Sequence, residues 1–461
     1  MDRRAFLTAS AGLLAGAVLR PGAQGWAQEA AAAPKRKPNV ILILADDLGW
    51  AELGCQGGSD IPTPHIDSIA RNGVRFTDGH VSCPLCSPTR AGLLTGRYQQ
   101  RFGHEFNPGP ATAADAEFGL PLSEATIADR FKSQGYKTGM FGKWHLGYKP
   151  EFHPLKRGFD EFYGFLGGAH DYRNVLSGKA DPILRGTEPV KEIDYTTEAF
   201  AREAVAFIEK HAQEPFFVYL PFNAVHGPLQ APQKYLDRFT SIENVTRRTF
   251  AAMLSALDDA VGSVLAKLDE LKLSDDTILL FLSDNGGPTP KTTSGNKPLH
   301  GFKAQMYEGG IRIPFMLQWK GHLPAGKVYE SPVISLDILP TALAAAGVSI
   351  DPEWKLDGVN LLPYLNGEKP EKPHETLYWR MGDQHAVRHG QWKLVHAKGA
   401  ANDELYDLTA DLSEAHDCAT AQPEKLKELQ QLYNAWNAQL AEPRWKGAGE
   451  KRPARRRQRA K

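Results

Sequence analysis

Residues 39–47 read NVILILADD, a continuous apolar run that stops abruptly at two aspartates. Three further runs have the same form, because each is rich in apolar residues and ends in polar ones. They are YKTGMFG at 136–142, FFVYL at 216–220 and TILLFL at 277–282. Continuous apolar runs of this length are typical of parallel strands buried on both faces, so the four stretches predict the core of a parallel sheet.

Helical patterns lie between the predicted strands. The clearest covers 250–271, where large apolar residues recur on one stripe at helical spacing. Strands that alternate with helices predict an α/β fold, here a large, mainly parallel sheet flanked by helices. Ligands of such sheets bind beyond the carboxyl ends of the strands. We therefore expect one site that gathers the polar residues after the four runs: Asp46, Asp47, Lys143, His145, His226, Asp284 and Asn285.

The pattern changes after Gly358. Short β-rich segments, separated by Gly, Asp and His, stand at 376–379, 386–387 and 392–395. They predict a short antiparallel sheet, and a helical stripe from Leu426 to Trp436 follows it. The domains we expect are a catalytic domain over 36–365, a smaller C-terminal α+β subdomain over 366–443 and a basic, disordered tail over 444–461.

Charge is balanced over the chain but not at its C-terminus. The 461 residues include 54 basic and 54 acidic side chains, and this balance argues against a nucleic-acid partner. The last eleven residues, KRPARRRQRAK, hold seven basic side chains, as in a disordered tail. Binding to an anionic surface is the alternative role for this segment.

The N-terminus has the layout of a bacterial export signal. Arg3 and Arg4 precede an apolar run of small residues at 5–19, and cleavage is plausible after Ala27. The paired arginines resemble the twin-arginine type, so we expect 1–27 to be removed by the export machinery and the product to be periplasmic or secreted. The run is too short for a stable membrane anchor, which needs about 20 residues. The alternative is a cytoplasmic protein with an apolar N-terminus.

Two acidic pairs, Asp46-Asp47 and Asp284-Asn285, offer only oxygen ligands. Such ligands suit a hard cation, Ca²⁺ or Mg²⁺, better than zinc. Either pair alone is also typical of a helix cap or a solvated turn. Their shared position after buried strands favours the metal site.

Residues 83–98 read CPLCSPTRAGLLTGRY. Pro88 fits the first turn of a helix, which places Cys86 at a helix N-terminus that favours anions, with Arg90 on the same side. This pattern predicts an activated cysteine beside an anion pocket, and a packed cysteine in a strand-to-helix turn is the alternative. Cys83 and Cys86 also form a CxxC, but no second CxxC follows at zinc-finger spacing.

The segments CSPTRAGLLTG at 86–96 and GYKTGMFGKWHLG at 135–147 resemble the two signatures of the type I, formylglycine-dependent sulfatases, of the arylsulfatase and N-acetylgalactosamine-6-sulfatase kind. The resemblance continues in the same order over most of 38–410. Its other segments are LADDLGW at 44–50, NAVHGPLQAP at 223–232, LSDNGG at 282–287 and FKAQMYEGGIRIPF at 302–315. That family belongs to the alkaline-phosphatase-like superfamily, which agrees with the predicted sheet.

The resemblance implies that a separate maturation enzyme oxidises Cys86 to formylglycine. A sulfated cysteine would have no easy internal route to release sulfate. An aldehyde hydrate has two hydroxyls: one attacks sulfur and displaces the alcohol, and the other loses its proton and expels sulfate.

The resemblance also implies the roles of the site residues. Asp46, Asp47, Asp284, Asn285 and the modified Cys86 would bind one Ca²⁺, with Mg²⁺ the less favoured ion. Asp284 would also accept the proton of the attacking hydroxyl. Arg90 and Lys143 would hold the hydrate, and Lys303 and His226 would contact the sulfate. His226 would donate a proton to the leaving group, and His145 would be the base for elimination.

Four matters stay open at this level. Thr89 replaces a serine common in the family motif, and Cys83 could pair with Cys86 or with Cys55. The expected substrate is a carbohydrate or aryl sulfate, and residues that could contact its leaving group are His104, His170, Asp171 and Arg173. A phosphonate or phosphate ester hydrolase of the same superfamily and an inactive glycan-binding protein are the competing functions.

Overall fold

The computed structural model describes residues 36–110, 112–178 and 180–447. The chain from Lys37 onward forms one compact unit. The predicted export signal at 1–27 lies outside the described residues, and so does most of the predicted basic tail.

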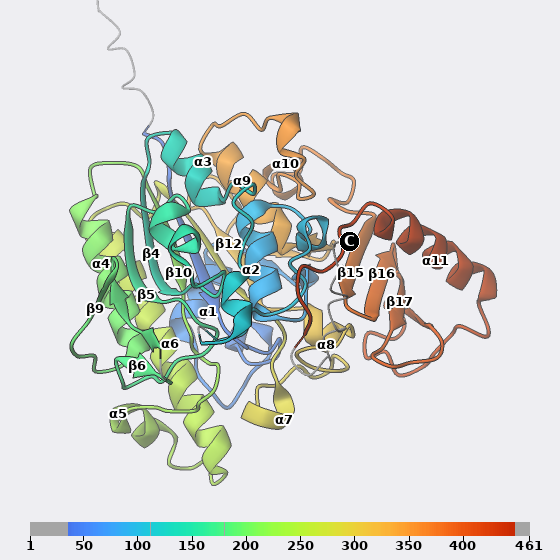
Figure 1. Ribbon diagram of the computed structural model, residues 1–461, viewed down its shortest axis with the longest axis horizontal. Helices are drawn as coiled ribbons and strands as arrows, with labels where there is room; N and C mark the ends of the chain where they lie inside the picture. The colour runs from blue at the N-terminus through green and yellow to red at the C-terminus, as the bar shows by residue number, and fades with distance from the viewer. Residues whose placement is uncertain (1–35, 111, 179, 448–461) are drawn as a thin grey trace, which may run out of the picture. The chain divides into compact units, whose positions relative to one another are not determined.

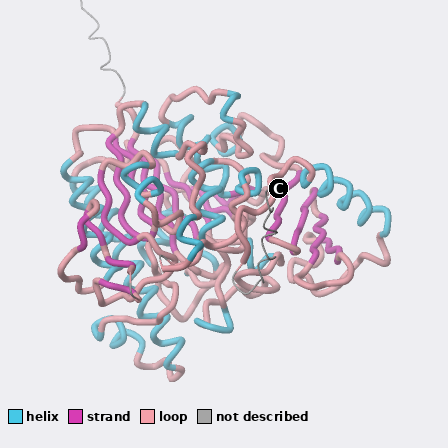
Figure 2. The backbone as a smooth tube through the Cα atoms, viewed as in Figure 1, coloured by secondary structure: helices cyan, strands magenta, loops and turns pink. Residues whose placement is uncertain are grey.

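The main sheet has ten strands in the order β13-β2-β12-β11-β1-β10-β4-β5-β8-β9. Figure 2 shows strands in magenta running side by side between helices in cyan. The central strands, all parallel, are β11 (Thr277–Ser283), β1 (Asn39–Ala45), β10 (Phe216–Pro221), β4 (Lys137–Lys143) and β5 (Glu161–Phe165). The outer strands, mostly antiparallel, are β12 (Phe315–Gln318), β2 (Val74–Phe76), β13 (Lys327–Tyr329), β8 (Leu184–Arg185) and β9 (Glu188–Pro189). All four strands predicted from the apolar runs are confirmed, and so is the mainly parallel α/β fold.

Side chains of β1 alternate between two buried layers. Val40, Leu42 and Leu44 belong to one layer and Ile41 and Ile43 to the other, because successive side chains of a strand point to opposite faces. Three helices cover the first layer: α2 (Cys86–Thr95), α3 (Ile127–Ser133) and α9 (Ile338–Ala345). Four helices cover the second layer: α1 (Pro64–Arg71), α4 (Thr196–Lys210), α5 (Gln233–Leu236) and α6 (Val245–Glu270) (Figure 1). The sheet is therefore buried on both faces, as the unbroken apolar runs require.

Helix α6 is the long helix predicted over 250–271. Its N-cap is Asn244, whose side chain accepts a hydrogen bond from the backbone N–H of Arg247. Among the described residues, α6 is the one helix that is long and apolar enough to cross a membrane. However, 72% of its most apolar stretch of 18 residues is buried inside the protein. It is the central helix of its layer, in contact with α1, α4 and α5.

A second sheet of four antiparallel strands follows the main one. Its strands are β15 (Thr376–Met381), β16 (Gln384–His389), β17 (Trp392–His396) and β18 (Glu404–Asp407), and α11 (Pro423–Asn437) packs on β16 and β17 (Figure 1). The short sheet and the helix expected after Gly358 are both present. Because the chain is one compact unit from Lys37 onward, the domain boundary at 365 stays a prediction.

Short elements complete the described structure. They are β3 (Gly79–His80) paired with β14 (Val333–Ile334), β6 (Leu176–Ser177) paired with β7 (Asp181–Pro182), and α7 (Thr289–Thr292), α8 (Glu308–Ile311) and α10 (Leu362–Leu365).

The expected start of the tail at residue 444 is wrong. The backbone N–H of Arg444 donates to the carbonyl oxygen of Gly103 at 2.9 Å. The Trp445 ring is buried, stacks on Phe118, and donates from Nε1 to the carbonyl oxygen of Phe106 at 3.1 Å. The folded chain therefore extends past 444, because Trp445 fills an apolar site. The prediction failed because the basic composition of this segment gives no sign of one buried tryptophan.

Gly142 lets strand β4 approach β10 closely just before Lys143. Its φ is 137°, and a Cβ atom there would lie 2.0 Å from the carbonyl oxygen of Pro221. A backbone atom of a central strand cannot move aside without shifting the sheet. Only glycine fits this position.

We expect Gly142→Ala to lower the free energy of unfolding by at least about 3 kcal/mol, because the new Cβ overlaps backbone and φ is unfavourable. The matched control is Gly347→Ala, whose φ of 71° is also left-handed but whose Cβ would meet nothing within 4 Å. The control should lose only about 1 kcal/mol. Urea unfolding and thermal melting measure both, and equal losses would contradict this account of Gly142.

Candidate active site

The carboxyl ends of four neighbouring parallel strands bring the predicted site residues together. Strand β1 leads into Asp46 and Asp47, and β11, its neighbour on one side, leads into Asp284 and Asn285. On the other side β10 leads towards His226, and β4 ends with Lys143 and is followed by His145. Parallel strands end at the same edge of a sheet, so residues up to 240 positions apart in the chain become neighbours.

Cys86 is the first residue of α2, and Leu85 is the N-cap. Two hydroxyl groups anchor this end of the helix: Ser87 Oγ donates to the carbonyl oxygen of His145 at 2.6 Å, and Thr89 Oγ1 donates to that of Cys83 at 2.6 Å. Thr89 therefore supplies a hydroxyl where the family motif commonly has serine. The predicted helix N-terminus at Cys86 is confirmed.

Three buried carboxylates each have a cationic partner. Lys143 Nζ lies 2.5 Å from Asp46 Oδ2, Arg90 donates to Asp284 Oδ2 at 2.7 Å, and Lys303 Nζ lies 2.6 Å from Asp47 Oδ1. Burial alone would raise the pKa of Asp46, but Lys143 and the other nearby cations hold it well below its usual range. Burial and the neighbouring Asp46 instead raise the pKa of Asp284. Asp46 is therefore the carboxylate that the cations keep charged inside the protein.

Two site residues have an unusual backbone. Asp47 has φ 63° and His145 has φ 59°, in the left-handed region that non-glycine residues seldom occupy. The backbone N–H of Asp47 donates to Asp284 Oδ1 at 3.2 Å, and that of His145 donates to the carbonyl oxygen of Leu166 at 3.1 Å. Such conformations persist where the surrounding structure fixes them, and they are most frequent at functional sites.

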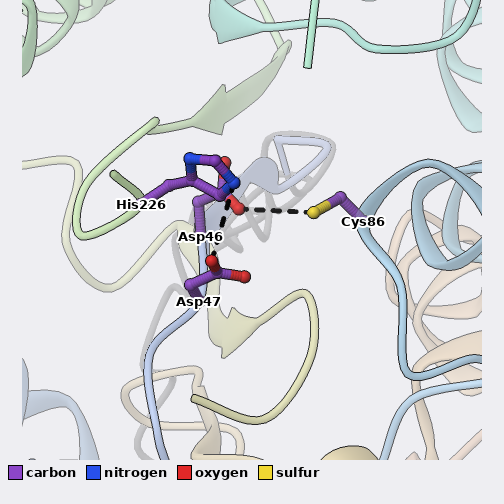
Figure 3. A group of neighbouring side chains, drawn as sticks. All are labelled: Asp46, Asp47, Cys86 and His226. Atoms are coloured by element: carbon purple, nitrogen blue, oxygen red, sulfur yellow. Dashed lines mark hydrogen bonds and ion pairs between the residues drawn. The ribbon is translucent and has the colours of Figure 1, made fainter. Parts of the chain in front are cut away.

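The oxygen-rich part of the site could hold a metal ion. Ligand atoms of Asp46, Asp47, Cys86 and His226 all lie within 4.8 Å of one another (Figure 3). Asn285 Nδ2 donates to Asp47 Oδ1 at 2.7 Å, whereas its Oδ1 is buried and has no hydrogen-bond partner. An unsatisfied buried oxygen beside carboxylates is a ligand position for a divalent cation, so these residues fit such an ion.

His226 lies at the edge of this group. Its Nδ1 is 2.6 Å from the carbonyl oxygen of Gly227, and its Nε2 is 3.6 Å from Asp47 Oδ2. It lines the same cavity as Cys86 and His145.

Lys303 and Cys86 are in direct contact. The Lys303 Nζ donates to Cys86 Sγ at 3.2 Å, and the sulfur lies 3.6 Å from Asp46 Oδ1. Burial raises the pKa of the Cys86 thiol to about 12. An unmodified Cys86 would therefore stay protonated near neutral pH and be a weak nucleophile.

The pKa of His145 is shifted in the opposite direction to that of Cys86. Burial, with Lys143 and Arg90 nearby, lowers the pKa of His145 well below its usual range. Its Nδ1 is buried without a hydrogen-bond partner. The imidazole is therefore neutral.

A cavity of about 430 Å³ opens over Cys86. Its walls come from several segments that the sequence did not single out. They are the loop with Asn107, Pro110 and Thr112, the segments after β4 and β5 with Tyr148 and Gly168, and the short pair β6–β7 with Ser177 and Asp181. No motif marks these positions, because loops with little periodicity form the walls.

None of the four residues expected to contact the leaving group lines this cavity. His104 is buried, with Nε2 2.7 Å from Ser87 Oγ, and His170 hydrogen-bonds the carbonyl oxygens of Asp171 and Asp181. The Asp171 carboxylate accepts hydrogen bonds from Gln230 and from backbone N–H groups of its own loop, and Arg173 is exposed. His104, His170 and Asp171 therefore hold neighbouring loops in place through these hydrogen bonds.

All four cysteines are free. Cys83 is buried in the layer that contains α2, whereas Cys55 packs against the opposite layer. The structure therefore contains neither of the disulfides left open by the sequence.

Comparison with known proteins identifies the family. A profile described as Sulfatase matches residues 38–348, and one described as N-sulphoglucosamine sulphohydrolase, C-terminal, matches residues 300–442. The N-acetylgalactosamine-6-sulfatase of Mus musculus is 35% identical over 389 residues, 79% of this chain and 72% of the relative. Arylsulfatase A of Homo sapiens is 34% identical over 457 residues, 86% of this chain and 87% of the relative.

Solved structures agree. Ps i-CgsB in complex with k-i-k-neocarrahexaose matches with a TM-score of 0.83 at 37% identity, over 89% of this chain and 95% of that chain. The phosphonate monoester hydrolase of Agrobacterium radiobacter matches over 87% and 96% with a TM-score of 0.66, but at 20% identity it shows the shared fold alone. The chain therefore belongs to the sulfatase family of the alkaline-phosphatase-like superfamily, and it hydrolyses sulfate esters.

Proposed function

We propose that this protein removes sulfate from a carbohydrate ester by means of a formylglycine made from Cys86 and a bound Ca²⁺. The observation that carries this proposal is the position of Cys86 at the head of α2, on the floor of a cavity, between paired carboxylates and cations. A protonated, buried thiol would not serve there as the nucleophile.

Asp46, Asp47, Asp284 and Asn285 would hold the cation, and the unsatisfied Asn285 Oδ1 supports this ligand set. Oxygen ligands of this kind favour Ca²⁺ or Mg²⁺. The ion would favour the deprotonated hydroxyl and offset charge on the sulfuryl group. The hydrated aldehyde at 86 would supply the attacking hydroxyl and a second hydroxyl for release of sulfate.

The cations around Cys86 would have two roles. Lys303, whose Nζ is within hydrogen-bond distance of the Cys86 side chain, would contact the sulfate. Arg90 and Lys143 are buried, each is paired with a carboxylate, and neither lines the cavity, so they would hold the hydrate at 86. Charges fixed in a dry site stabilise negative charge that develops on the sulfate oxygens.

Two histidines line the cavity and differ in their surroundings. His226 keeps contact with Asp47 and is partly exposed, which suits a proton donor to the leaving oxygen. His145 is neutral with a free Nδ1, which suits the base for the elimination step.

A carbohydrate leaving group fits the cavity above this floor. Tyr148, Asp181 and Thr112 offer polar atoms, and a few polar groups in a concave site are typical of oriented ligand binding. The relatives include N-acetylgalactosamine-6-sulfatases and a protein solved with an oligosaccharide, which supports the same substrate class here. Aryl sulfates, with a smaller leaving group, would also be turned over.

Export and maturation belong to the same proposal. The N-terminal pattern at 1–27 supports transport of the chain to the periplasm or beyond, and conversion of Cys86 needs a separate maturation enzyme.

Mass spectrometry of the peptide that contains Cys86 should reveal an aldehyde in place of the thiol. Cys86→Ala should lower aryl sulfate turnover by at least about a thousandfold, because the nucleophile is lost. The control, Cys418→Ala, removes a partly exposed cysteine far along the chain and should keep full activity. An active enzyme with an unmodified thiol would overturn the scheme, and a clear preference for aryl phosphate over aryl sulfate would instead favour a phosphate ester hydrolase.

Removal of divalent ions by a chelator should abolish activity, and Ca²⁺ should restore it better than Mg²⁺. Asn285→Ala should raise the Ca²⁺ concentration needed for half-maximal activity by at least about tenfold, since one ligand is lost. Asn360→Ala, which removes only a hydrogen bond to the backbone N–H of Leu362, is the control and should leave that concentration unchanged. Full activity in excess chelator would exclude the metal site.

Asp181→Asn should raise KM for a sulfated oligosaccharide about tenfold with little change in kcat, because a hydrogen bond that a sugar hydroxyl donates to a charged carboxylate contributes about 1.5–3 kcal/mol. KM for a small aryl sulfate, which would not reach Asp181, should not change. Asp171→Asn is the control, since its carboxylate lies in a nearby loop but does not line the cavity. A similar rise in KM for both substrates would mean that Asp181 only holds its loop.

A further inference from the structure

Three neighbouring strands of the C-terminal sheet place two histidines and an aspartate in one row. His385 of β16 pairs directly with His396 of β17, so their side chains lie on the same face of the sheet. Because Val395 pairs with Glu404, Asp403, the residue directly before β18, lies next to His396. The row has no part in the sulfatase site, which is built on the main sheet.

The three side chains point their ligand atoms at a common place. His396 Nδ1 lies 2.8 Å and His385 Nε2 lies 3.8 Å from Asp403 Oδ1, and all three atoms are within 4.8 Å of one another. In a tetrahedral zinc site with bonds of about 2.0–2.1 Å, neighbouring ligand atoms lie about 3.4 Å apart. The observed distances lie on either side of that value.

Neighbouring groups fix these ligands in place. Gln430 of α11 donates from Nε2 to Asp403 Oδ2 at 2.7 Å, which leaves Oδ1 for the shared position. The His385 ring hydrogen-bonds the Asp383 backbone and stacks on Tyr433, with ring centroids 3.9 Å apart. Metal-binding histidines usually have such a hydrogen bond from the ring nitrogen that does not bind the ion.

The row of three side chains is also accessible to solvent. The side chains of His385, His396 and Asp403 are 18%, 22% and 14% exposed, so an ion and its remaining water ligands can reach them.

In two other groups of histidine and acidic residues, the carboxylates already have partners and are not free to bind a metal ion. Asp78, His80 and Glu308 already meet the cations Arg312, Arg388 and Lys393 in a buried network. The carboxylate of Asp258, beside His65, accepts hydrogen bonds from the backbone N–H groups of His65 and Ile66. In both groups the carboxylate oxygens are already engaged.

We propose that His385, His396 and Asp403 form a second metal site, which binds Zn²⁺ or a similar borderline transition metal ion with its open positions towards solvent. Two imidazoles and one carboxylate suit such an ion, unlike the oxygen-only ligands of the sulfatase site. The ion would join β16, β17 and β18 and, through Gln430, hold α11 to them.

The test uses the purified, matured full chain without an affinity tag, freed of transition metals and kept in excess Ca²⁺ throughout. Zn²⁺ binding is measured by calorimetry, and Co²⁺ binding by its visible absorption. We expect one equivalent of either ion to bind, and His385→Gln and Asp403→Asn each to weaken binding at least about tenfold. Zn²⁺ should also raise the melting temperature of the wild type but not of these variants.

Two controls separate this site from other histidines. His389→Gln changes a partly exposed histidine of the same strand β16, and His65→Gln removes the histidine beside Asp258; both variants should bind Zn²⁺ like the wild type. Unchanged aryl sulfatase activity and unchanged melting in the absence of Zn²⁺ would show that the ligand variants are folded. Absence of Zn²⁺ binding in the wild type, or undiminished binding in both ligand variants, would overturn the proposal.

Discussion

Three carboxylates buried at neighbouring strand ends impose the constraint on which this structure depends. Asp46, Asp47 and Asp284 cannot stay charged away from water unless positive groups compensate them, and loss of one partner of a buried pair costs about 3–5 kcal/mol. Lys143, Arg90 and Lys303 are those partners. The same ion pairs therefore contribute to the stability of the fold and gather three cations at the strand ends that form the site.

Lys303 joins this charge network to Cys86. Its Nζ contacts both Asp47 Oδ1 and the sulfur of Cys86. The side chain of Lys303 is 16% exposed, whereas those of Lys143 and Arg90 are fully buried. Lys303 is therefore the one of these three cations that solvent reaches.

The site residues that could be predicted from the sequence are those that directly follow the strands of the main sheet. Asp46, His145 and Asp284 could be placed from sequence because an apolar run fixes where a parallel strand ends, and parallel strands end together. Lys303 stands in a loop without periodicity, so only the family resemblance indicated it. Asp181 and Tyr148 left no signal at all, because the walls of the cavity depend on how long loops fold back on the sheet.

The prediction of the fold from the sequence was limited in a similar way. Helix α6 and the central strands follow from periodicity, whereas the start of the tail at 444 was wrong. A composition rich in basic residues predicts a solvated tail, but composition says nothing of a single large side chain that finds a buried site. Trp445 is such a side chain, packed on Phe118 and hydrogen-bonded to Phe106.

The C-terminal sheet supports the active site from outside it. The Gln384 amide donates to the carbonyl oxygen of Ala304 at 3.3 Å, next to Lys303. Five residues after Lys303, the Glu308 carboxylate accepts a hydrogen bond from Lys393 of β17 at 2.8 Å. The loop that brings Lys303 to Cys86 is therefore held at two points by the second sheet, so any displacement of β16 or β17 would move a cation of the sulfatase site. This coupling gives the smaller sheet a role in the placement of active-site charge, although it supplies none of the residues that line the cavity.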